Sequence, residues 1–303
     1  MDIKEIFQKT NLKVKYNEPL SKYTSWQVGG FALIFIEPQT QNGLQTALKI
    51  CTANKIPFFI IGAGSNLLIS DQGYKGAVIK LKEEFEQITF DMNKCQCKTG
   101  ASVRLPYLIK KYVDNECSGL ELLSGIPGTV GGALIMNAGT KDSAISDTLV
   151  SVNVMDMNGK TTTLSKSQIK FDYRKSSLEG PAVLGAIFHI GKKTKQDIVD
   201  SITKTLINRN KTQPLATFNA GSVFKNPAGK FPDGTPYTAG RLIDETGLKG
   251  FSVGKAVVSD KHANFIINSG GATSEDICLL IEEIQKKVNN KFNVKLELEV
   301  KLI

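Results

Sequence analysis

The sequence has few of the side chains that build metal centres or disulfide frameworks. Its 303 residues include only two histidines, His189 and His262, and five cysteines. The cysteines are an odd number, and no pair of them has the C-x-x-C spacing. We therefore expect neither a metal site nor a disulfide framework.

Long hydrophobic runs are also absent. The longest, Phe31 to Ile36 and Phe58 to Ile61, are far shorter than the roughly 20 residues that a membrane-spanning helix needs. The stretch from Met1 to Lys9 lacks the apolar core, basic flank and cleavage site of a secretory signal. These absences predict a cytoplasmic protein that has no membrane partner.

Arginine is scarce although the chain is basic. The net charge is +9, but only four of the 38 basic residues are arginines, and the lysines are scattered instead of forming one stripe with interleaved aromatic residues. This pattern argues against nucleic acid as a partner and favours a site for small, multiply charged ligands such as dinucleotides and nucleotide sugars. A surface that binds polyanions is the alternative.

The hydrophobic pattern as far as Ile190 predicts short strands and two amphipathic helices. The helical faces consist of Leu44, Ala47, Leu48 and Cys51 and of Leu105, Leu108, Ile109 and Tyr112. Strands are expected at residues 58–61, 67–69, 77–81, 88–90, 95–99 and 183–190. Between 149–157 and 160–164, the pair Asn158-Gly159 predicts a β-hairpin with a type I′ turn.

The remaining sequence has the pattern of an α+β unit. A helix is expected at residues 196–210, with Ile198, Ile202 and Leu206 on one side. Thr273 and Asp276 predict a capping box at the start of a second helix, whose buried stripe is Ile277, Leu280, Ile281, Ile284 and Val288. Strict alternation over residues 294–301 predicts a final strand, with Glu297 and Glu299 on the same face.

A glycine loop joins the strands expected at 58–61 and 67–69. Its sequence, Gly62-Ala-Gly-Ser-Asn-Leu67, lacks the third glycine of the dinucleotide fingerprint and leads into a strand, so we do not expect a Rossmann fold. The glycines still let backbone N–H groups turn toward an anion, and a pyrophosphate is the natural ligand. A tight turn that binds nothing is the alternative.

A second loop holds the densest group of glycines in the chain: Gly125, Gly128, Gly131, Gly132 and Gly139. Glycine loses the most backbone freedom on folding, so this density indicates that a ligand approaches the backbone closely. Two such loops far apart in the chain suit a long, two-ended ligand such as FAD, whereas packing alone is the alternative. The predicted cofactor-binding residues are Gly62, Ala63, Gly64, Ser65, Asn66, Leu67, Ser124, Gly125, Ile126, Pro127, Gly128, Gly131, Gly132, Asn137, Ala138 and Gly139.

Several sequence strings resemble those of one enzyme family. They are Tyr23-Thr-Ser-Trp-Gln-Val-Gly-Gly30, Gly62-Ala-Gly-Ser-Asn66, Ser124-Gly-Ile-Pro-Gly-Thr-Val-Gly-Gly132 with Met136-Asn-Ala-Gly139, Phe171-Asp-Tyr-Arg174, Ala220-Gly-Ser-Val-Phe-Lys-Asn-Pro227 and Leu296-Glu-Leu-Glu-Val300. Their order and extent are similar to those of the UDP-N-acetylenolpyruvoylglucosamine reductase (MurB) family. Only a short stretch separates Tyr173-Arg174 from the expected third domain, and in this length the chain is similar to the family's subtype that lacks an extra tyrosine-bearing insertion.

The resemblance implies a fold, a reaction and cofactors. The expected fold is α+β, with FAD-binding subdomains of the vanillyl-alcohol oxidase type at 1–79 and 80–196 and a substrate-binding domain at 197–303. The expected reaction uses FAD, with NADPH as hydride donor, to reduce UDP-N-acetylglucosamine enolpyruvate to UDP-N-acetylmuramate for peptidoglycan synthesis. The implied partners are the nucleotide sugar and NADPH, and we expect a monomer.

Three residues match the family's catalytic positions. The resemblance implies that Arg174 stabilises the substrate carboxylate and that Ser222 protonates the neighbouring carbon. Glu299 would donate a hydrogen bond from a carboxyl group whose pKa is raised when substrate is bound. Each residue also has an ordinary alternative: a surface ion pair for Arg174, a turn position for Ser222 and a solvated strand face for Glu299.

The same resemblance assigns substrate contacts to Tyr173, Lys225 and Asn226. Lower-ranked candidates are Arg209, Arg241, His262 and Asn264. Two other functions stay open at this point. One is an FAD-dependent oxidase of the same fold, which would not need the catalytic set above, and the other is a non-catalytic module that binds nucleotide sugars.

Overall fold

The computed structural model describes residues 3–303, so the first two residues of the first predicted domain lie outside the described part. The helices are α1 (Ile3–Gln8), α2 (Gln41–Ala53), α3 (Leu105–Asp114), α4 (Val130–Ile135), α5 (Lys195–Thr212), α6 (Ala239–Glu245) and α7 (Ser274–Phe292). Short 3₁₀ helices lie at Leu20–Tyr23, Glu83–Glu86, Glu121–Leu123 and Lys166–Gln168.

The strands are mostly short. They are β1 (Lys13–Pro19), β2 (Phe31–Glu37), β3 (Phe58–Ile60), β4 (Leu67–Leu68), β5 (Tyr74–Ile79), β6 (Ile88–Asp91), β7 (Gln96–Gly100), β8 (Cys117–Ser118), β9 (Leu149–Met155), β10 (Thr161–Ser165), β11 (Phe171–Asp172), β12 (Lys175–Ser176), β13 (Ala182–His189), β14 (Gly191–Lys192), β15 (Ser252–Val253), β16 (Ala256–Val258), β17 (Ile266–Asn268) and β18 (Lys301–Leu302). Separate sheets combined with helices confirm the predicted α+β class.

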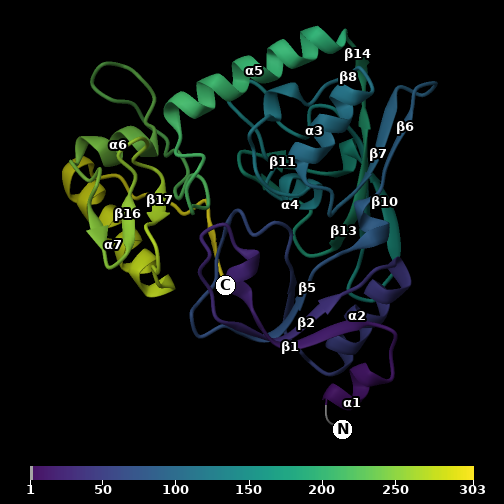
Figure 1. The fold of residues 1–303 in the computed structure, drawn as a ribbon. Helices are drawn as coiled ribbons and strands as arrows, with labels where there is room; N and C mark the ends of the chain where they lie inside the picture. Colours follow the sequence, from purple (N-terminus) through teal and green to yellow (C-terminus); the bar gives the residue numbers. More distant parts are fainter. Residues whose placement is uncertain (1–2) are drawn as a thin grey trace. The chain divides into compact units, whose positions relative to one another are not determined.

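The chain forms two compact units, each built from several segments (Figure 1). Unit 1 comprises Met1–Glu18, Ala32–Ala63 and Lys75–Ile207. Unit 2 comprises Pro19–Phe31, Gly64–Tyr74 and Asn208–Ile303. The division falls inside the first glycine loop, and the domain boundaries expected from the sequence stay a prediction.

Unit 1 contains two main sheets. One has the strand order β1-β2-β5-β3, and the other has the order β10-β9-β13-β7-β6. Strands β3 and β5 are parallel, with Ile60 opposite Ile79, so their carboxyl ends lie at the same edge of the sheet. The first glycine loop leaves β3 at this edge, and Lys80 follows β5 there.

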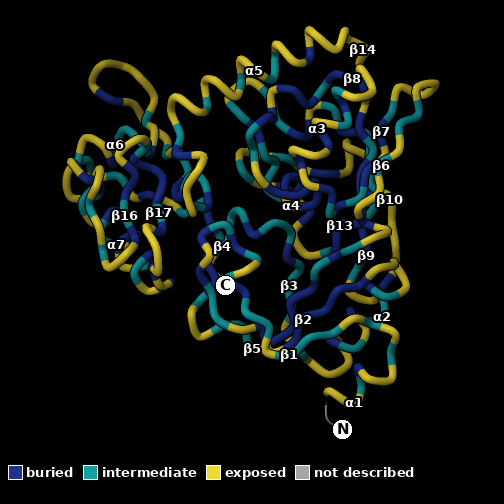
Figure 2. The backbone as a smooth tube through the Cα atoms, in the orientation of Figure 1, coloured by how far each residue is buried: buried dark blue, intermediate teal, exposed yellow. Residues whose placement is uncertain are grey.

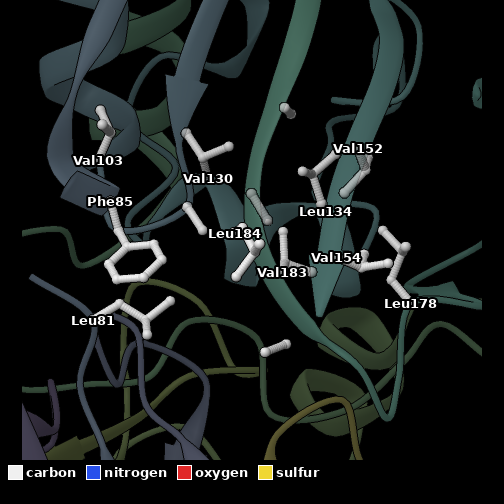
Figure 3. Close-up of a cluster of buried hydrophobic side chains, with 14 of the residues drawn as sticks. Leu81, Phe85, Val103, Val130, Leu134, Val152, Val154, Leu178, Val183 and Leu184 are labelled. Atoms are coloured by element: carbon white, nitrogen blue, oxygen red, sulfur yellow. The ribbon is translucent and has the colours of Figure 1, made fainter. Parts of the chain in front are cut away.

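The core of unit 1 anchors the helix that follows the second glycine-rich stretch. Val130 and Leu134 of α4 are fully buried and belong to the same cluster as Val183 and Leu184 of β13 (Figure 3). Figure 2 shows the contrast with α5, which is exposed along most of its length. Burial of one face of α4 therefore fixes the loop residues before it.

Unit 2 has a separate core around Trp26 and α7. Its antiparallel sheet β15-β16-β17 contacts α7, which also packs against α6. The fully buried Trp26 donates from its indole Nε1 to the Ile266 carbonyl at 2.8 Å, and Asn268 Nδ2 donates to the Trp26 carbonyl at 2.9 Å. These bonds tie Pro19–Phe31 to β17.

Most predicted elements are confirmed. Helices α2 and α3 bury the predicted faces, and strands β3 to β7 and β13 overlap the predicted strands. Helix α7 begins at the capping box of Thr273 and Asp276, and its predicted stripe is buried. Helix α5 is present as predicted, but only Ile198 on it is fully buried, and Leu206 is exposed.

The predicted type I′ turn is wrong. Strands β9 and β10 do form a hairpin, but Met155 pairs with Thr161, so residues 156–160 connect them. The Asp156 carboxylate accepts hydrogen bonds from the N–H groups of Asn158 and Lys160. A side-chain acceptor at the start of the loop stabilises this longer connection.

The predicted final strand over residues 294–301 is also largely wrong. The segment makes an isolated bridge at Leu298 with Phe224 and then forms β18, which pairs with β4. Burial still alternates there, with Leu296 and Val300 buried. The alternation is correct, but a regular strand needs a partner of matching length, and the partner segments here are short.

The described part of the chain also bears on membranes and metals. No helix within residues 3–303 is both long enough and apolar enough to cross a bilayer. In the same range, no group of His, Cys, Asp or Glu side chains could hold a metal ion. The five cysteines are free thiols.

Candidate active site

The first glycine loop presents a row of backbone donors. None of the N–H groups of residues 62–66 donates a hydrogen bond to an acceptor within residues 3–303. Backbone N–H groups in folded proteins are nearly always paired with protein, water or a ligand. Successive amides of this kind can bind a phosphate group.

Close packing explains the two glycines of this loop. Gly64 has a φ of +63°, and a Cβ there would lie 1.9 Å from the backbone oxygen of Tyr23. At Gly62, a Cβ would lie 2.5 Å from Thr129 Oγ1. Since Thr129 precedes α4, the two glycine loops meet at this contact within unit 1.

The start of α4 is already hydrogen-bonded within the protein. Thr129 Oγ1 accepts from the N–H of Gly132 at 3.4 Å. The N–H groups of Val130 and Gly131 donate to the carbonyls of Val103 and Ala101, each at 2.9 Å. We therefore assign the free anion-binding amides to the first loop and not to this short helix.

Two side chains near α4 carry a buried oxygen that has no hydrogen-bond partner among the described residues. They are Ser124 Oγ and Asn137 Oδ1, and Ser124 is only 3% exposed. Leaving such an oxygen unsatisfied costs about 1–3 kcal/mol. A bound polar ligand would remove this cost, so these residues and the open amides of Gly62 and Ala63, which belong to the same unit, fit FAD.

Arg174 lies on a hairpin that is fixed to the end of α4. Strands β11 and β12 pair with each other and leave Tyr173 and Arg174 as the connection. The anchoring hydrogen bonds are Asn137 Nδ2 to the Asp172 carbonyl at 3.1 Å, Arg174 Nη1 to the Gly139 carbonyl at 3.1 Å and Ser176 Oγ to the Ile135 carbonyl at 2.9 Å. Unit 1 thus brings Arg174 together with the predicted cofactor residues Asn137 and Gly139.

The backbone of Arg174 is strained. Its φ is +56°, a left-handed conformation that costs a residue other than glycine about 1–2 kcal/mol. The guanidinium carbon lies 5.1 Å from the centroid of the Tyr173 ring, which is itself 50% exposed. Strain of this kind persists where the surroundings over-determine a conformation, and it often accompanies function.

Ser222 and Glu299 belong to segments that pair with each other in unit 2. The Val223 carbonyl, next to Ser222, accepts a hydrogen bond from the N–H of Glu299 at 2.8 Å. Asn66 of the first glycine loop donates from Nδ2 to the Glu299 carbonyl at 3.0 Å. Unit 2 thus brings two predicted catalytic residues together with a predicted cofactor residue, whereas Arg174 belongs to unit 1.

The structure distinguishes Glu299 from Glu297. The side chain of Glu297 is 78% exposed, and its carboxylate lies 3.5 Å from Lys225 Nζ. Glu299 is partly buried. An exposed glutamate beside a surface lysine is an ordinary solvated pair, so Glu299 is the better candidate for chemistry.

Asn264 fixes the segment that carries Ser222. Its side chain accepts from the N–H of Phe224 at 2.9 Å and donates to the Phe224 carbonyl at 2.8 Å. Its backbone carbonyl accepts from the N–H of Val223 at 2.9 Å. Asn264 is only 4% exposed, so its contribution in this structure is to position the backbone beside Ser222.

A pocket of about 380 Å³ opens beside Ser222 in unit 2, a volume typical of small-molecule sites. Its lining also includes Asn226, Thr238, Gly240, Arg241, Asp244, Lys249, Lys261, His262, Ala263 and Asn264. Burial lowers the pKa of His262, so its ring is neutral at pH 7. Accordingly, His262 Nδ1 accepts a hydrogen bond from the N–H of Asn264 at 3.2 Å.

The basic side chains of this pocket already have partners in the protein. Arg241 contacts Asp233 at 2.8 Å and Glu245 at 2.7 Å, and its guanidinium carbon lies 3.8 Å from the centroid of the Phe231 ring. Lys249 contacts an aspartate of the lining at 2.6 Å. These contacts hold the charged groups in the pocket wall.

Sequence reasoning found some of these residues and missed others. Ser222 and Asn226 line the pocket as predicted site residues, and the lower-ranked Arg241, His262 and Asn264 line it too. Arg209 lies in the last turn of α5 and is not part of the lining. The missed lining residues are Thr238, Gly240, Asp244, Lys249, Lys261 and Ala263. The sequence feature that could have indicated this part of the pocket is the Lys261-His262 pair just before Asn264.

Comparison with known proteins identifies both parts of the chain. Residues 32–165 match the FAD binding domain family, and residues 213–303 match the family described as UDP-N-acetylenolpyruvoylglucosamine reductase, C-terminal domain. The reductase of that name from Caldanaerobacter subterraneus subsp. tengcongensis is 39% identical over 99% of this chain and 96% of its own length. The one from Clostridioides difficile is 40% identical over 100% of this chain and 97% of its own length.

Solved structures agree with these matches. The UDP-N-acetylenolpyruvylglucosamine reductase of Thermus caldophilus is 35% identical, with a TM-score of 0.79, and the match covers 96% of this chain and 98% of that one. Phl p 4.0202, a glucose dehydrogenase, is 16% identical, has a TM-score of 0.51 over 64% of this chain and 45% of its own, and shares the fold alone. The fold and the match to the FAD binding domain family define an FAD-dependent oxidoreductase. More specifically, the chain belongs to the UDP-N-acetylenolpyruvoylglucosamine reductase family.

Proposed function

We propose that this protein is an NADPH-dependent flavoenzyme that reduces the enolpyruvyl ether of UDP-N-acetylglucosamine enolpyruvate to UDP-N-acetylmuramate. The supporting observation is that a curated reductase of this family aligns with 99% of the chain. The reaction supplies peptidoglycan precursors and, through them, growth of the cell wall and cell division. The protein acts in the cytoplasm as a monomer, with domains at 1–79, 80–196 and 197–303.

The residues proposed to hold FAD are those of the two glycine loops. The open amides of residues 62–66 would bind its diphosphate, and Ser124 and Asn137 would pair their buried oxygens with its polar groups. Bound FAD would supply hydride-transfer chemistry between NADPH and the enolpyruvyl group. The protein's own contribution is to bind, to orient and to move a proton.

Arg174 is proposed to stabilise the carboxylate of the substrate. As hydride reaches the terminal carbon of the enolpyruvyl group, negative charge spreads into that carboxylate. A guanidinium remains protonated and can hold a carboxylate with two hydrogen bonds. The hydrogen bond from Arg174 Nη1 to the Gly139 carbonyl fixes its direction beforehand, so little reorganisation is needed during the reaction.

Ser222 is proposed to give its hydroxyl proton to the carbon next to the carboxylate. The hydroxyl is a weak acid, but the carbon of an enediolate is a strong base, so the transfer is feasible when the two are held together. Backbone pairing with the Glu299 segment and the contacts of Asn264 hold Ser222 in place. Glu299, protonated in the substrate complex, would donate a hydrogen bond to the developing charge.

The nucleotide part of the substrate is proposed to bind in the pocket beside Ser222. Asn226 lines this pocket, and its Oδ1 accepts from the N–H of Ala239 at 3.0 Å, so its amide NH₂ is the group directed to a ligand. Lys225 and Tyr173 are further proposed contacts for the diphosphate or sugar. Because Lys225 lies 3.5 Å from Glu297, binding would exchange that surface ion pair for a substrate phosphate.

Absorbance spectroscopy of the purified protein tests the proposed function. The protein should be yellow, NADPH should bleach the flavin band, and UDP-N-acetylglucosamine enolpyruvate should restore the band quickly while oxygen restores it slowly. An oxidase of the same fold would instead be bleached by an alcohol or sugar and reoxidised rapidly by oxygen. A colourless protein that binds nucleotide sugars would contradict both enzymatic readings.

Matched variants test the assigned roles. We expect Ser222→Ala to lower kcat about 10²- to 10⁴-fold, the usual contribution of a general acid, while NADPH still bleaches the flavin at the wild-type rate. Glu299→Gln should lower kcat at least about tenfold, whereas Glu297→Gln should change kcat less than about twofold because that side chain is solvated. A Glu299→Gln variant that keeps most of its turnover would contradict the role given to Glu299.

A further inference from the structure

Lys80 contacts the carbonyl side of the first glycine loop. Because β3 and β5 are parallel and Ile60 lies opposite Ile79, the residues that follow these two strands emerge at the same sheet edge. Lys80 Nζ donates a hydrogen bond to the Gly62 carbonyl at 2.8 Å. Register therefore places a half-buried ammonium group directly against the loop that presents open amides.

This hydrogen bond orients the loop. In a trans peptide, the C=O and the N–H of the same unit point in opposite directions. Holding the Gly62 carbonyl on the lysine side therefore turns the N–H of Ala63 toward the other side. Among the described residues, 3–303, the N–H groups of residues 62–66 have no protein acceptor, as expected for a row of amides that binds an anion.

Burial and neighbouring charges together lower the pKa of the Lys80 ammonium group. Partial burial is the main cause that lowers its pKa to about 8, and Lys82 and Arg104 lower it further, while Glu37 and Glu86 act in the opposite direction. The two glutamates also have other partners, since Glu86 lies 3.5 Å from Lys82 and Glu37 lies 3.1 Å from Lys15. Lys80 is therefore charged at pH 7 and loses its charge within about a unit above pH 8.

We infer that Lys80 is a positioning residue for FAD, which fixes the first glycine loop with its amides turned to the dinucleotide and adds a positive charge on the carbonyl side of that loop. The inference rests on the proposed function, since it requires that the chain bind FAD. It follows that FAD binding stabilises the protonated lysine and takes up a proton above pH 8. Affinity should then fall as the pH rises, because the free protein must be protonated first.

Fluorescence titration of the FAD-free full chain with FAD between pH 7 and pH 9 tests the inference. Wild-type affinity should fall about tenfold over this range. Lys80→Gln should bind about tenfold more weakly at pH 7 and show no further fall, and Lys80→Arg should bind within about threefold of wild type at both pH values, because a guanidinium does not titrate there.

Lys82→Gln is the matched control, since it removes a neighbouring lysine that does not contact the loop. It should leave the affinity at pH 7 within about twofold of wild type and move the fall to higher pH, because Lys82 lowers the pKa of Lys80. A purely structural lysine would lower the thermal midpoint of the Gln variant without producing any pH dependence of binding.

Two results would overturn the inference: a wild-type affinity that is flat from pH 7 to pH 9, or a Lys80→Gln variant that binds FAD as tightly as wild type. If Lys80→Gln does not fold, as judged by circular dichroism, the wild-type pH profile and Lys80→Arg decide the question. A wild-type chain that binds no FAD at any pH would refute the proposed function itself and with it this inference.

Discussion

Gly64→Ala should destabilise the protein through a backbone collision. The new Cβ would lie 1.9 Å from the Tyr23 oxygen, and the two segments must separate by about 1.5 Å to reach the 3.4 Å of ordinary contact. The left-handed φ of +63° adds its own cost. About 1–2 kcal/mol for the conformation and about 1–3 kcal/mol for the forced displacement give a loss of about 2–5 kcal/mol in the free energy of unfolding.

Gly247→Ala is the matched control for this prediction. Gly247 also has a left-handed backbone, with φ of +73°, but a Cβ there would meet nothing within 4 Å. Its expected cost is only about 0.5–1 kcal/mol, because alanine also restricts the unfolded chain. Differential scanning calorimetry should show a fall in midpoint of about 3–8 °C for Gly64→Ala and of only about 1–2 °C for Gly247→Ala.

FAD affinity completes the test of Gly64. Displacement of the loop should weaken FAD binding by more than about tenfold in Gly64→Ala, since the amides of residues 62–66 must converge on one ligand, and should leave Gly247→Ala unchanged. Equal midpoints for the two variants, together with wild-type affinity in Gly64→Ala, would refute the reasoning from close packing.

Three further predictions concern single side chains. Trp26→Phe leaves the Ile266 carbonyl without its 2.8 Å donor and should cost about 1–3 kcal/mol in the free energy of unfolding. Calorimetry against wild type measures this cost, and a midpoint equal to that of wild type would count against a stabilising role for this hydrogen bond. Hydrogen bonds from the hydroxyl and N–H of Thr235, followed by those from Arg241, lower the pKa of Asp233 to about 2 from its usual 3.8. The stabilisation is therefore present above pH 4 and is lost as the pH falls through 2. Asp233→Asn should lower the midpoint at pH 7, and calorimetry should show this difference shrinking toward zero below pH 2. Arg174→Lys should lower kcat about 10²- to 10³-fold in steady-state assays, while the rate of flavin reduction by NADPH stays unchanged. A slower reduction of the flavin by NADPH would contradict a role of Arg174 that is confined to the enolpyruvyl substrate.

Features encoded by neighbouring residues could be predicted from the sequence. The capping box of Thr273 and Asp276 and the apolar stripe of α7 lie within a few turns of one helix, so periodicity alone locates them. The first glycine loop could also be found, because glycine was needed at position 64 for a positive φ and a close backbone contact. In both cases a local signal was sufficient.

Features that depend on distant pairing could not be predicted. Nothing in the sequence shows that the Val223 carbonyl accepts from the N–H of Glu299, although the resemblance named Ser222 and Glu299 separately. The β9–β10 hairpin was predicted, but its turn type was wrong because the Asp156 carboxylate favours a longer loop than the turn that Asn-Gly indicates. Lys80 was missed because its role depends on the parallel register of β3 and β5.

The chain passes repeatedly between the units, and this has a consequence for its synthesis. Pro19–Phe31 belongs to the same unit as Asn208–Ile303, and the Trp26 indole finds its acceptor only at Ile266. A nascent chain halted after residue 207 would have an indole with no core to enter, so unit 2 can close only late in translation. Truncated expression fragments should accordingly aggregate through this tryptophan, and cutting the gene at one point cannot yield two separately folding halves.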